Sequence, residues 1–517
     1  MLFNSYTFIF IFLPVVLLGF FWLARSGQTL ATAWLAFASL FFYGYWNPAY
    51  VGLLLLSIVA NYTFGTWIAK AGVRHERATQ KRVLVVAIAA NLLLLAYFKY
   101  ANFFVSNLNE VAGTAWEVNK IILPLGISFF TFTQIAFLVD TWRGEVKEYN
   151  FAHYLLFVTY FPHLIAGPVL HHKEMMPQFA RPATFKFHGE NFALGLTIFV
   201  LGLAKKVLLA DSLAEFPGPI FAAASAGGAP SVFEAWIGAL SYALQLYFDF
   251  SGYSDMAIGL SLMFNVRLPL NFNSPYRAAS IIDFWRRWHM TLSRFLRDYL
   301  YIPLGGNRRG PARRHLNMMV TMLLGGLWHG AGWTFVVWGG LHGLYLAINH
   351  SWRALRGKLG LGEGGGLVRI LSVLLTFLAV VVAWVFFRAE NFASALSILA
   401  GMAGQNGLSL SESAWYSLHE SHPDWLAGVA MNGLAPLSKV NGDRALILIL
   451  LGLMIVWLLP NVQQMMRGFR PVLDGEALTE TRLRWRFHPV YAWLTALAFV
   501  LSLSFLSRVR DFLYFQF

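Results

Sequence analysis

The chain of 517 residues contains no cysteine and has few charged residues. The absence of cysteine excludes disulfides, zinc–thiolate sites, iron–sulfur clusters and a cysteine nucleophile. Only 12% of the residues are charged, whereas globular proteins average about 25%. A soluble protein of this size needs more polar surface than these residues supply. The composition therefore excludes a soluble globular enzyme, a disordered chain and a fibrous repeat.

Apolar residues make up 57% of the chain and aromatic residues 16%. Because crossing a hydrocarbon core takes about 20 apolar residues, we predict an all-α, polytopic integral membrane protein. We expect the first apolar run to be a span and not a cleaved signal peptide, since no Lys or Arg precedes it. Some runs are short or interrupted by Gly and Pro, which indicates re-entrant or broken helices. The runs at or near spanning length are 6–24, 30–45, 49–69, 83–97, 121–139, 151–170, 192–204, 232–248, 333–349, 370–387, 445–459 and 491–506.

The sequence indicates one domain, because no repeat, low-complexity tract or soluble segment separates these runs. We predict a single transmembrane domain over residues 1–517, with a catalytic core at about 120–350. The net charge of +14 comes from 39 basic and 25 acidic residues. In a membrane protein such an excess belongs to cytoplasmic loops, and no basic, aromatic-rich block indicates a nucleic-acid groove.

The basic loops predict the orientation of the chain in the membrane. Clusters of Lys and Arg at 70–82, 286–314 and 353–358 indicate cytoplasmic segments, which places the N-terminus outside. The acidic and aromatic loop at 401–443 reads as external. The charges of residues 150–210 do not fix their side of the membrane.

His329 lies in an apolar stretch rich in glycine: seven of the 23 residues from 321 to 343 are Gly. A helix over 316–328 covers only about 20 Å, which is too short to cross the bilayer and re-enter. We therefore predict a hairpin with His329 near its apex, deep in the membrane. An ionisable group at that depth is a candidate functional residue. The alternative is a core histidine bonded to a backbone carbonyl.

Residues 283–299 have the periodicity of an interfacial amphipathic helix with one basic face. His289 falls at the edge of the apolar face, where it is either a second functional residue or an interfacial histidine. The arginines are either lipid anchors or ligands for an anionic acyl donor, such as a CoA phosphate or an acidic carrier protein. The candidate donor-binding residues are Arg286, Arg287, Trp285 and Trp288.

Asp249 and Asp255 lie in apolar surroundings. A buried carboxylate is costly unless it is paired or protonated, so we expect a structural role for both, with partners among the arginines at 286–297. We expect no metal site, because His419 and His422 have the spacing of a ligand pair but no third ligand is near.

Seven stretches of the chain resemble the membrane-bound O-acyltransferase (MBOAT) family, in the order expected for its bacterial exopolysaccharide branch. The resemblance implies the MBOAT helical fold with a central tunnel. It also places the family's key intramembrane histidine on His329 and its second polar position on His289. The chain past Arg388 carries no matching motif. The matching stretches are MLFNSYTF at 1–8, LPLGISFFTF at 123–132, FPHLIAGP at 161–168, YFDFSGYSD at 247–255, DFWRRWH at 283–289, YIPLGG at 301–306 and LWHGAGW at 327–333.

The resemblance implies an O-acyltransferase of the cell inner membrane, with no bound cofactor. It would move acetyl groups from a cytoplasmic donor, acetyl-CoA, across the membrane for O-acetylation of an exopolysaccharide, with alginate as the leading acceptor. Its expected partners are membrane lipid, a periplasmic SGNH-type acetyltransferase and the polysaccharide machinery, and no nucleic acid. The residue types are consistent with acyl transfer, because imidazole is the best base or nucleophile near neutral pH in a chain without cysteine.

Several alternatives stay open at this point. The acceptor could be cellulose, peptidoglycan or another glycan, and the acyl group could be D-alanyl. A transporter or flippase without acyl chemistry also has buried polar residues and broken helices. For acyl transfer, we expect His289 and His329 to line one passage between the two sides of the membrane. The sequence does not choose between a covalent His329 intermediate and direct transfer.

Overall fold

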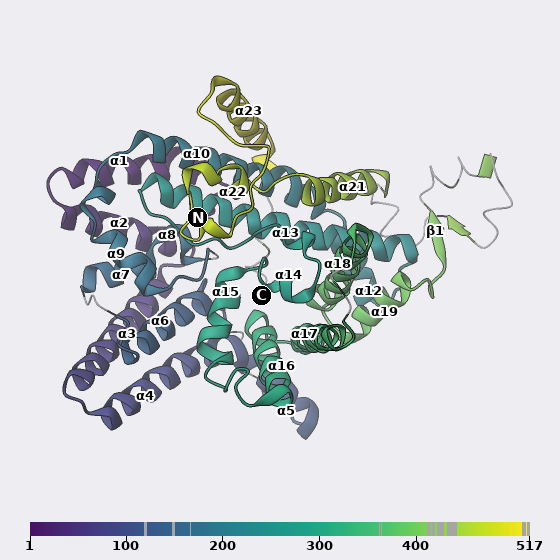
Figure 1. The fold of residues 1–517 in the computed structure, drawn as a ribbon, viewed down its shortest axis with the longest axis horizontal. Coiled ribbons are helices and arrows are strands. Elements are labelled where there is room, and N and C mark those ends of the chain that lie inside the picture. Colours follow the sequence, from purple (N-terminus) through teal and green to yellow (C-terminus); the bar gives the residue numbers. More distant parts are fainter. Residues whose placement is uncertain are drawn as a thin grey trace.

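The computed structural model describes residues 1–117, 121–146, 150–165, 167–360, 362, 364–410, 415, 419–420, 429–431, 442–508 and 513. The regular secondary structure of this part of the chain is helical apart from one parallel pair of three-residue strands, β1 (Leu408–Leu410) and β2 (Val429–Met431). Figure 1 shows the helices gathered into one body, from which the strand pair projects on one side. The predicted all-α membrane fold is confirmed.

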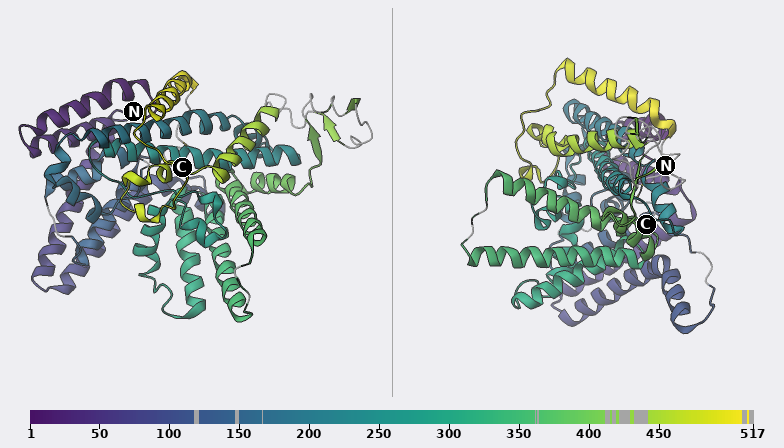
Figure 2. Two further views of the ribbon diagram at one scale, coloured as in Figure 1. Left: turned by 45° about the horizontal axis from the view of Figure 1, so that its top comes forward. Right: turned by 90° about the vertical axis from the view of Figure 1, so that its right-hand side faces the viewer.

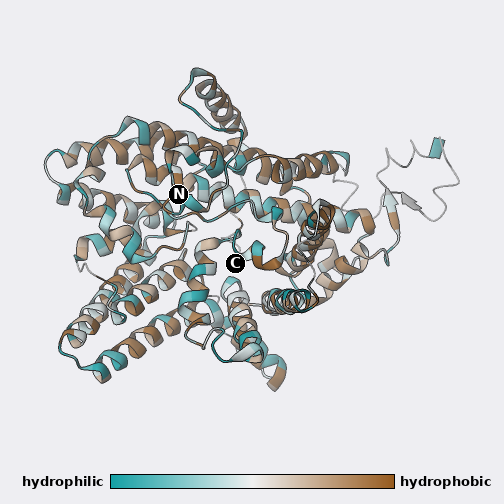
Figure 3. Cartoon of the chain, viewed as in Figure 1, coloured by the Kyte–Doolittle hydropathy of each residue, from teal (hydrophilic) through white to brown (hydrophobic). Residues whose placement is uncertain are grey.

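The first part of the chain consists of long helices joined by short turns. Two π-helical segments, η1 (Phe8–Phe12) and η2 (Ala96–Tyr100), run directly into their neighbouring α-helices. The turn between α3 and α4 is polar, as the teal ribbon at the lower left of Figure 3 shows. The α-helices are Leu13–Ala24 (α1), Gln28–Gly44 (α2), Ala49–Val73 (α3), Arg77–Leu95 (α4), Ala101–Ala112 (α5) and Ile127–Trp142 (α6).

The middle of the chain is more broken. The predicted single span over 151–170 is wrong, because the helix ends before Tyr160 and resumes only as four residues; Pro162 lacks the backbone N–H that a continuous helix requires. The elements are Phe151–Thr159 (α7), Phe161–Leu164 (α8), His172–Phe179 (α9), Pro182–Phe185 (η3), Gly189–Ala204 (α10), Lys205–Ala210 (η4), Asp211–Leu213 (α11), Pro217–Ser225 (α12) and Val232–Met263 (α13).

The last part contains the hairpin α16–α17 and a set of helices past Arg388. Most of the predicted external loop at 401–443, including His422, lies outside the described residues. The α-helices are Ile281–Trp285 (α14), Met290–Leu296 (α15), Gly310–His329 (α16), Trp333–Lys358 (α17), Gly366–Arg388 (α18), Phe392–Met402 (α19), Gly442–Leu458 (α21), Val462–Met465 (α22) and Pro489–Phe505 (α23). The short segments are Pro275–Arg277 (η5), Arg297–Tyr301 (η6), Arg467–Phe469 (η9), Gly475–Ala477 (η10) and Leu506–Arg508 (η11).

Four helical stretches in the described residues are long and apolar enough to cross a membrane: Ala49–Val73, Arg77–Ala112, Gly189–Leu213 and Gly366–Arg388. Shorter apolar helices add to them, among them Phe8–Ala24, Ile127–Trp142 and Pro489–Phe505. The multi-pass membrane prediction is therefore confirmed. The run predicted at 232–248 belongs instead to the 32-residue α13, which is buried along most of its length.

Helices α10 and α13 form the centre of the protein and cross at very short distance. A Cβ atom at Gly195 would overlap the carbonyl oxygen of Gly259, and one at Gly202 would overlap that of Gly252. Glycine is therefore required at these positions, since any side chain would force the helices apart. The other helices pack around this pair.

The basic segments share one end of the molecule. In the right-hand view of Figure 2, the start of α16 and the α17–α18 connection lie at the left, whereas the N-terminus and the end of α5 lie at the right. The basic residues around 308–314 and 353–358 thus face the same side. This arrangement agrees with the orientation expected from the loop charges.

Candidate functional site

The α16–α17 hairpin carries His329 at its turn. Helix α16 ends at His329 and α17 begins at Trp333, so only Gly330–Gly332 separates them. A Cβ at Gly326 would overlap the carbonyl oxygen of Phe335, and one at Gly339 would overlap that of Met322. The glycine-rich stretch therefore lets the two helices touch along their backbones, as predicted.

The length argument for this hairpin was wrong, although the hairpin itself is confirmed. Helix α16 has 20 residues and starts at Gly310, so it spans about 30 Å. The polar residues before Leu316 extend it toward the basic end of the molecule. His329 thus lies at the end of a full-length helix and not on a re-entrant piece.

The His329 side chain is 6% exposed and lies among aromatic rings. Its ring centroid is 4.9 Å from that of Trp328, 5.1 Å from Trp338 and 5.4 Å from Phe387. Two other buried histidines, His289 and His342, and the ammonium of Lys99 lie within electrostatic range of it. The site therefore concentrates imidazole groups in an apolar environment, where proton transfer is shielded from bulk water.

His289 is fully buried and held by Asn271. The Nδ1 atom of His289 lies 3.0 Å from the side-chain oxygen of Asn271, which also accepts a hydrogen bond from Thr291 at 2.9 Å. Because that oxygen can only accept, Nδ1 of His289 carries the proton and donates it, and Nε2 is the basic nitrogen. Asn271 therefore fixes the tautomer that a base needs.

The predicted amphipathic helix over 283–299 is wrong. The segment breaks into α14, a turn and α15, because His289 adopts a left-handed backbone with φ of 41°. Periodicity does not reveal such a residue, since positive φ is uncommon for any residue other than glycine. Consequently the residues of this segment do not form one apolar and one basic face.

The four candidate donor-binding residues have different environments. Trp288 is 3% exposed and packs in the core, and Trp285 donates its indole N–H to Nδ1 of His342 at 3.2 Å. The guanidinium of Arg287 pairs with Asp283 at 2.8 Å. Arg286 is exposed. The structure thus brings the two tryptophans toward the histidines and leaves Arg286 accessible.

A chain of ring contacts links the two candidate histidines. The Trp338 ring, which contacts His329, stacks on Trp384 at 5.6 Å, and Trp384 contacts Trp288 at 5.0 Å. Trp288 packs against Phe272, whose ring contacts that of His289. The sites therefore belong to one aromatic cluster. The central tunnel and the continuous passage stay predictions.

Asp249 and Asp255 are both ion-paired, but their partners are lysines and not the arginines at 286–297. Lys206 lies 2.6 Å from Asp249 and 2.7 Å from Asp211, and Lys205 lies 2.5 Å from Asp255. The π-helical segment η4 places both lysines against α13. Lys205 and Asp255 are 50 positions apart in the sequence, and the packing of the α10–η4 helix against α13 brings them together. The sequence alone does not reveal a pair that depends on this packing.

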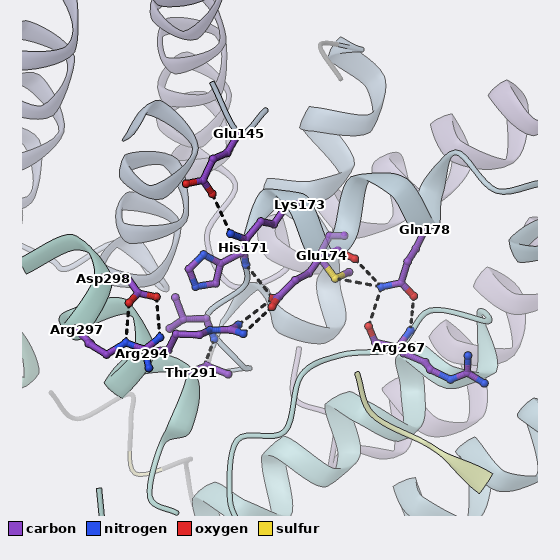
Figure 4. A network of polar contacts seen from close by, with 12 residues as sticks. Glu145, His171, Lys173, Glu174, Gln178, Arg267, Thr291, Arg294, Arg297 and Asp298 are labelled. Carbon is purple, nitrogen blue, oxygen red and sulfur yellow. Dashed lines mark hydrogen bonds and ion pairs between the residues drawn. The ribbon is translucent and has the colours of Figure 1, made fainter. Parts of the chain in front are cut away.

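A polar network joins α9 to the α15–η6 segment (Figure 4). Both carboxylate oxygens of Glu174 accept from Arg294, at 2.6 and 2.9 Å. The ring of His171 lies 3.0 Å from the hydroxyl of Tyr299, which donates to Asp140 at 2.7 Å. Burial, assisted by the positive charge of Arg294, lowers the pKa of His171 to about 3, so this ring is neutral at physiological pH. The network holds α9 against α15 and η6, the segment that directly follows His289.

A small cavity of about 130 Å³ lies beside the hairpin turn. Trp328, Lys99 and Ser128 contribute to its wall, together with Trp46 from the α2–α3 turn. By the predicted orientation, that turn lies on the side opposite to the basic loops. Trp328 thus contacts the ring of His329 and lines this cavity.

A cationic patch lies at the other end of the hairpin. Arg286 follows the end of α14, Arg314 lies in α16 and Arg353 lies in α17. The positive charge of each of them acts on His350. Because the patch contains Arg286 and residues from both helices of the hairpin, it joins the accessible member of the predicted donor-binding set to the element that carries His329.

The profile of the MBOAT, membrane-bound O-acyltransferase family matches residues 16–389, which include α16, α17 and the segment from Asn271 to His289. The chain belongs to the membrane-bound O-acyltransferase family. Membership makes it an O-acyltransferase, and the hypothesis of a transporter without acyl chemistry is set aside.

The relatives of this MBOAT protein act on different polymers, according to their names. The chain is 46% identical to the peptidoglycan O-acetyltransferase of Helicobacter pylori, over 79% of this chain and 81% of the relative. It is 44% identical to the probable alginate O-acetylase AlgI of Pseudomonas aeruginosa, over 80% and 76%. A teichoic acid D-alanyltransferase of Streptococcus thermophilus is 27% identical over 47% of this chain and 60% of its own length.

Sequence reasoning missed two polar residues of the site, Lys99 and Asn271. Lys99 is a lone cation in an apolar stretch, and the predicted run at 83–97 was ended before it. Asn271 is a single polar residue between buried leucine and phenylalanine side chains. In a membrane protein both signals indicate a polar contact inside the fold.

Proposed function

We propose that this MBOAT protein transfers acetyl groups from cytoplasmic acetyl-CoA, across the inner membrane, for O-acetylation of a polysaccharide outside. The position of His329 supports this proposal most directly. It lies at the turn of a hairpin whose other end carries the cationic patch and whose turn adjoins the cavity lined by Trp328. A periplasmic SGNH-type acetyltransferase would place the acetyl group on the polymer.

The donor would bind where the arginines lie. The phosphates of CoA are recognised well by guanidinium groups, and Arg286, Arg314 and Arg353 form such a group at the basic end. In this arrangement the bulky CoA stays on the cytoplasmic side. Only the acetyl thioester end of the donor reaches toward His329.

The chemistry requires a base or a nucleophile at the acetyl carbon. An imidazole nitrogen of His329 takes the proton of the acceptor hydroxyl, whose oxygen attacks the thioester carbonyl. The C–S bond breaks, and the CoA thiolate takes up the proton. His289, with its Nε2 as the basic nitrogen, shares the proton or orients the donor. A covalent acetyl–His329 intermediate satisfies the same balance in two steps.

Alginate is the leading acceptor, and peptidoglycan is the second candidate. Relatives named for both polymers have similar identities, 44% and 46%. The test is to delete the gene and to measure the acetate that mild base releases from each purified polymer. Loss of ester-linked acetate from an exopolysaccharide containing mannuronate supports alginate. Loss from peptidoglycan alone supports the second candidate.

We expect the basic end of α16 to face the cytoplasm. Asn307 is exposed next to this end, and the chain has no native cysteine, so a single introduced thiol reports its own position. In intact cells, Asn307→Cys should resist an impermeant maleimide and react only after permeabilisation. Ala112→Cys, at the exposed end of α5, is the matched control and should react in intact cells. The reverse pattern would place the donor on the wrong side.

We expect Asn271 to control the activity of His289. Asn271→Leu removes the acceptor that fixes the His289 tautomer, and should reduce acetyl transfer about 10- to 100-fold. Ser254→Ala is the control, because it removes only the partner of the Asn271 amide nitrogen, at 3.1 Å. It should keep transfer within about threefold of wild type. Equal rates for the two variants, at equal amounts of membrane protein, would contradict a role for His289.

A further inference from the structure

The C-terminal carbonyls of α16 are all hydrogen-bonded, and most of their partners come from another helix. The carbonyl of Gly326 accepts from the backbone N–H of Gly330. The hydroxyl of Tyr100 donates to Leu327 O at 2.9 Å. The ammonium of Lys99 donates to the carbonyls of Trp328 and His329, at 2.5 and 3.1 Å. A helix end normally leaves four such carbonyls without an intrahelical donor.

Lys99 and Tyr100 reach these carbonyls because a π-helical segment interrupts their helix. They are the last two residues of η2, which connects α4 to α5. A π-segment inserts an extra residue into the turn and so changes the direction of the side chains that follow. The same helix contacts the hairpin again at Asn107, which accepts from the indole of Trp333 at 2.7 Å.

The bonding capacity of Lys99 is fully used at the hairpin turn. Its third hydrogen bond goes to the hydroxyl of Ser128 at 3.4 Å, and its charge lies 5.8 Å from the centre of the Trp328 ring. In the described part of the chain no carboxylate pairs with it. Burying a cation inside a membrane protein costs free energy, and such residues are usually functional. Here the negative end of the α16 dipole attracts the Lys99 ammonium.

We infer that Lys99 is a positioning residue for His329, an inference that rests on the proposed catalytic role of His329. Lys99 bonds the carbonyl of His329 itself and that of the preceding residue. It therefore fixes the end of α16 at the residue whose side chain must meet the acetyl group. Without it, the carbonyls of Trp328 and His329 would lose the donor that ties them to η2, and the backbone at His329 would move.

The test compares Lys99→Met with Lys99→Arg in protein purified into liposomes, with acetyl-CoA as the donor. Methionine keeps the length of the side chain and removes every donor. We expect it to lower kcat about 10- to 100-fold, because small displacements of a reacting group have effects of this size. The KM for acetyl-CoA should stay within about twofold, since the donor patch is untouched. Arginine retains donors and charge, and should restore most of kcat.

Lys81→Met, at an exposed position of α4, is the matched control and should leave kcat and KM unchanged. A merely structural role of Lys99 predicts less folded protein but a normal kcat per folded molecule, and that result would overturn the inference. If Lys99→Met does not reach the membrane, Tyr100→Phe decides. We expect Tyr100→Phe to lower kcat by a smaller factor, and an unchanged kcat there would equally overturn it.

The inference and the proposed function fail differently. If His329→Ala retains activity, the catalytic role of His329 is wrong, whatever Lys99 does. If His329→Ala is inactive and Lys99→Met has the wild-type kcat, only the positioning role is wrong. In the His329→Ala background, a further Lys99→Met change should leave the residual rate unaltered, because the imidazole that Lys99 positions is already absent.

Discussion

Replacing His329 by alanine is expected to abolish O-acetylation of the polymer while the protein remains in the membrane. The expected loss is at least about 100-fold, because a positioned base or nucleophile contributes that much or more. His329 is the buried imidazole at the hairpin turn, between the proposed donor side and the cavity lined by Trp328. The measurement is the ester-linked acetate of the polymer, together with the amount of protein in the membrane.

His342→Gln is the matched control for this experiment. His342 is also fully buried, it lies on the partner helix α17 of the same hairpin, and it accepts a hydrogen bond from Trp285. A loss of acetylation caused only by disturbed packing would appear in both variants. Loss in His329→Ala with retention in His342→Gln supports chemistry at His329. Normal acetylation in a well-expressed His329→Ala variant ends the catalytic claim.

Replacing Lys206 by methionine is expected to remove most of the folded protein. Lys206 lies within 2.7 Å of both Asp249 and Asp211, and all three side chains are nearly inaccessible. Removing one partner of a buried ion pair costs about 3–5 kcal/mol, a large share of the about 5–15 kcal/mol that stabilises a typical protein. The measurement is the amount and thermal stability of the protein in the membrane.

Two further variants separate the charge from the side chain itself. Lys186→Met changes an exposed lysine and should leave the protein at its normal level. The double variant Lys206→Met with Asp249→Asn removes one of the uncompensated charges and should recover part of the lost protein. If Lys206→Met accumulates normally but is inactive, the cluster is functional and its structural assignment is wrong.

The hairpin could be predicted from the sequence because its signal is local. Dense glycine around His329 indicates close helix packing, and α16 and α17 do pack through Gly326 and Gly339. The charges of short loops likewise predicted that the start of α16 and the end of α17 face one side. The length of α16 was misjudged because the polar residues from Gly310 onward were assigned to a loop, although they continue the helix.

The environment of His289 could not be predicted from periodicity. One residue with positive φ ends the helical pattern, and its cause is tertiary: the ring must turn toward Asn271 and Phe250. A helical projection assigns every residue of 283–299 to a face of one cylinder. It therefore misplaced Arg287, which bonds Asp283 and does not project from a basic surface.

Reading lysines as markers of loops does not reveal the lysines that lie inside the fold, which here are Lys99, Lys205 and Lys206. Each was treated as a mark of a span end or of a loop, and each lies inside the fold with specific partners. Two of them follow from the π-segment η4 and the third from η2. Each π-segment inserts one residue into a helical turn and so turns the following side chains toward a different face of the helix. Hydrophobic periodicity and loop charge do not reveal such an insertion.

The most direct test of the account is the release of CoA by the purified protein in liposomes. Because the chain has no cysteine, a thiol reagent reports only the CoA that leaves acetyl-CoA. With acetyl-CoA supplied on the side of the α16 basic end, the wild-type protein should release CoA and the His329→Ala variant should not. Equal release by the two folded proteins, or release only when acetyl-CoA is supplied on the opposite side, would contradict the account.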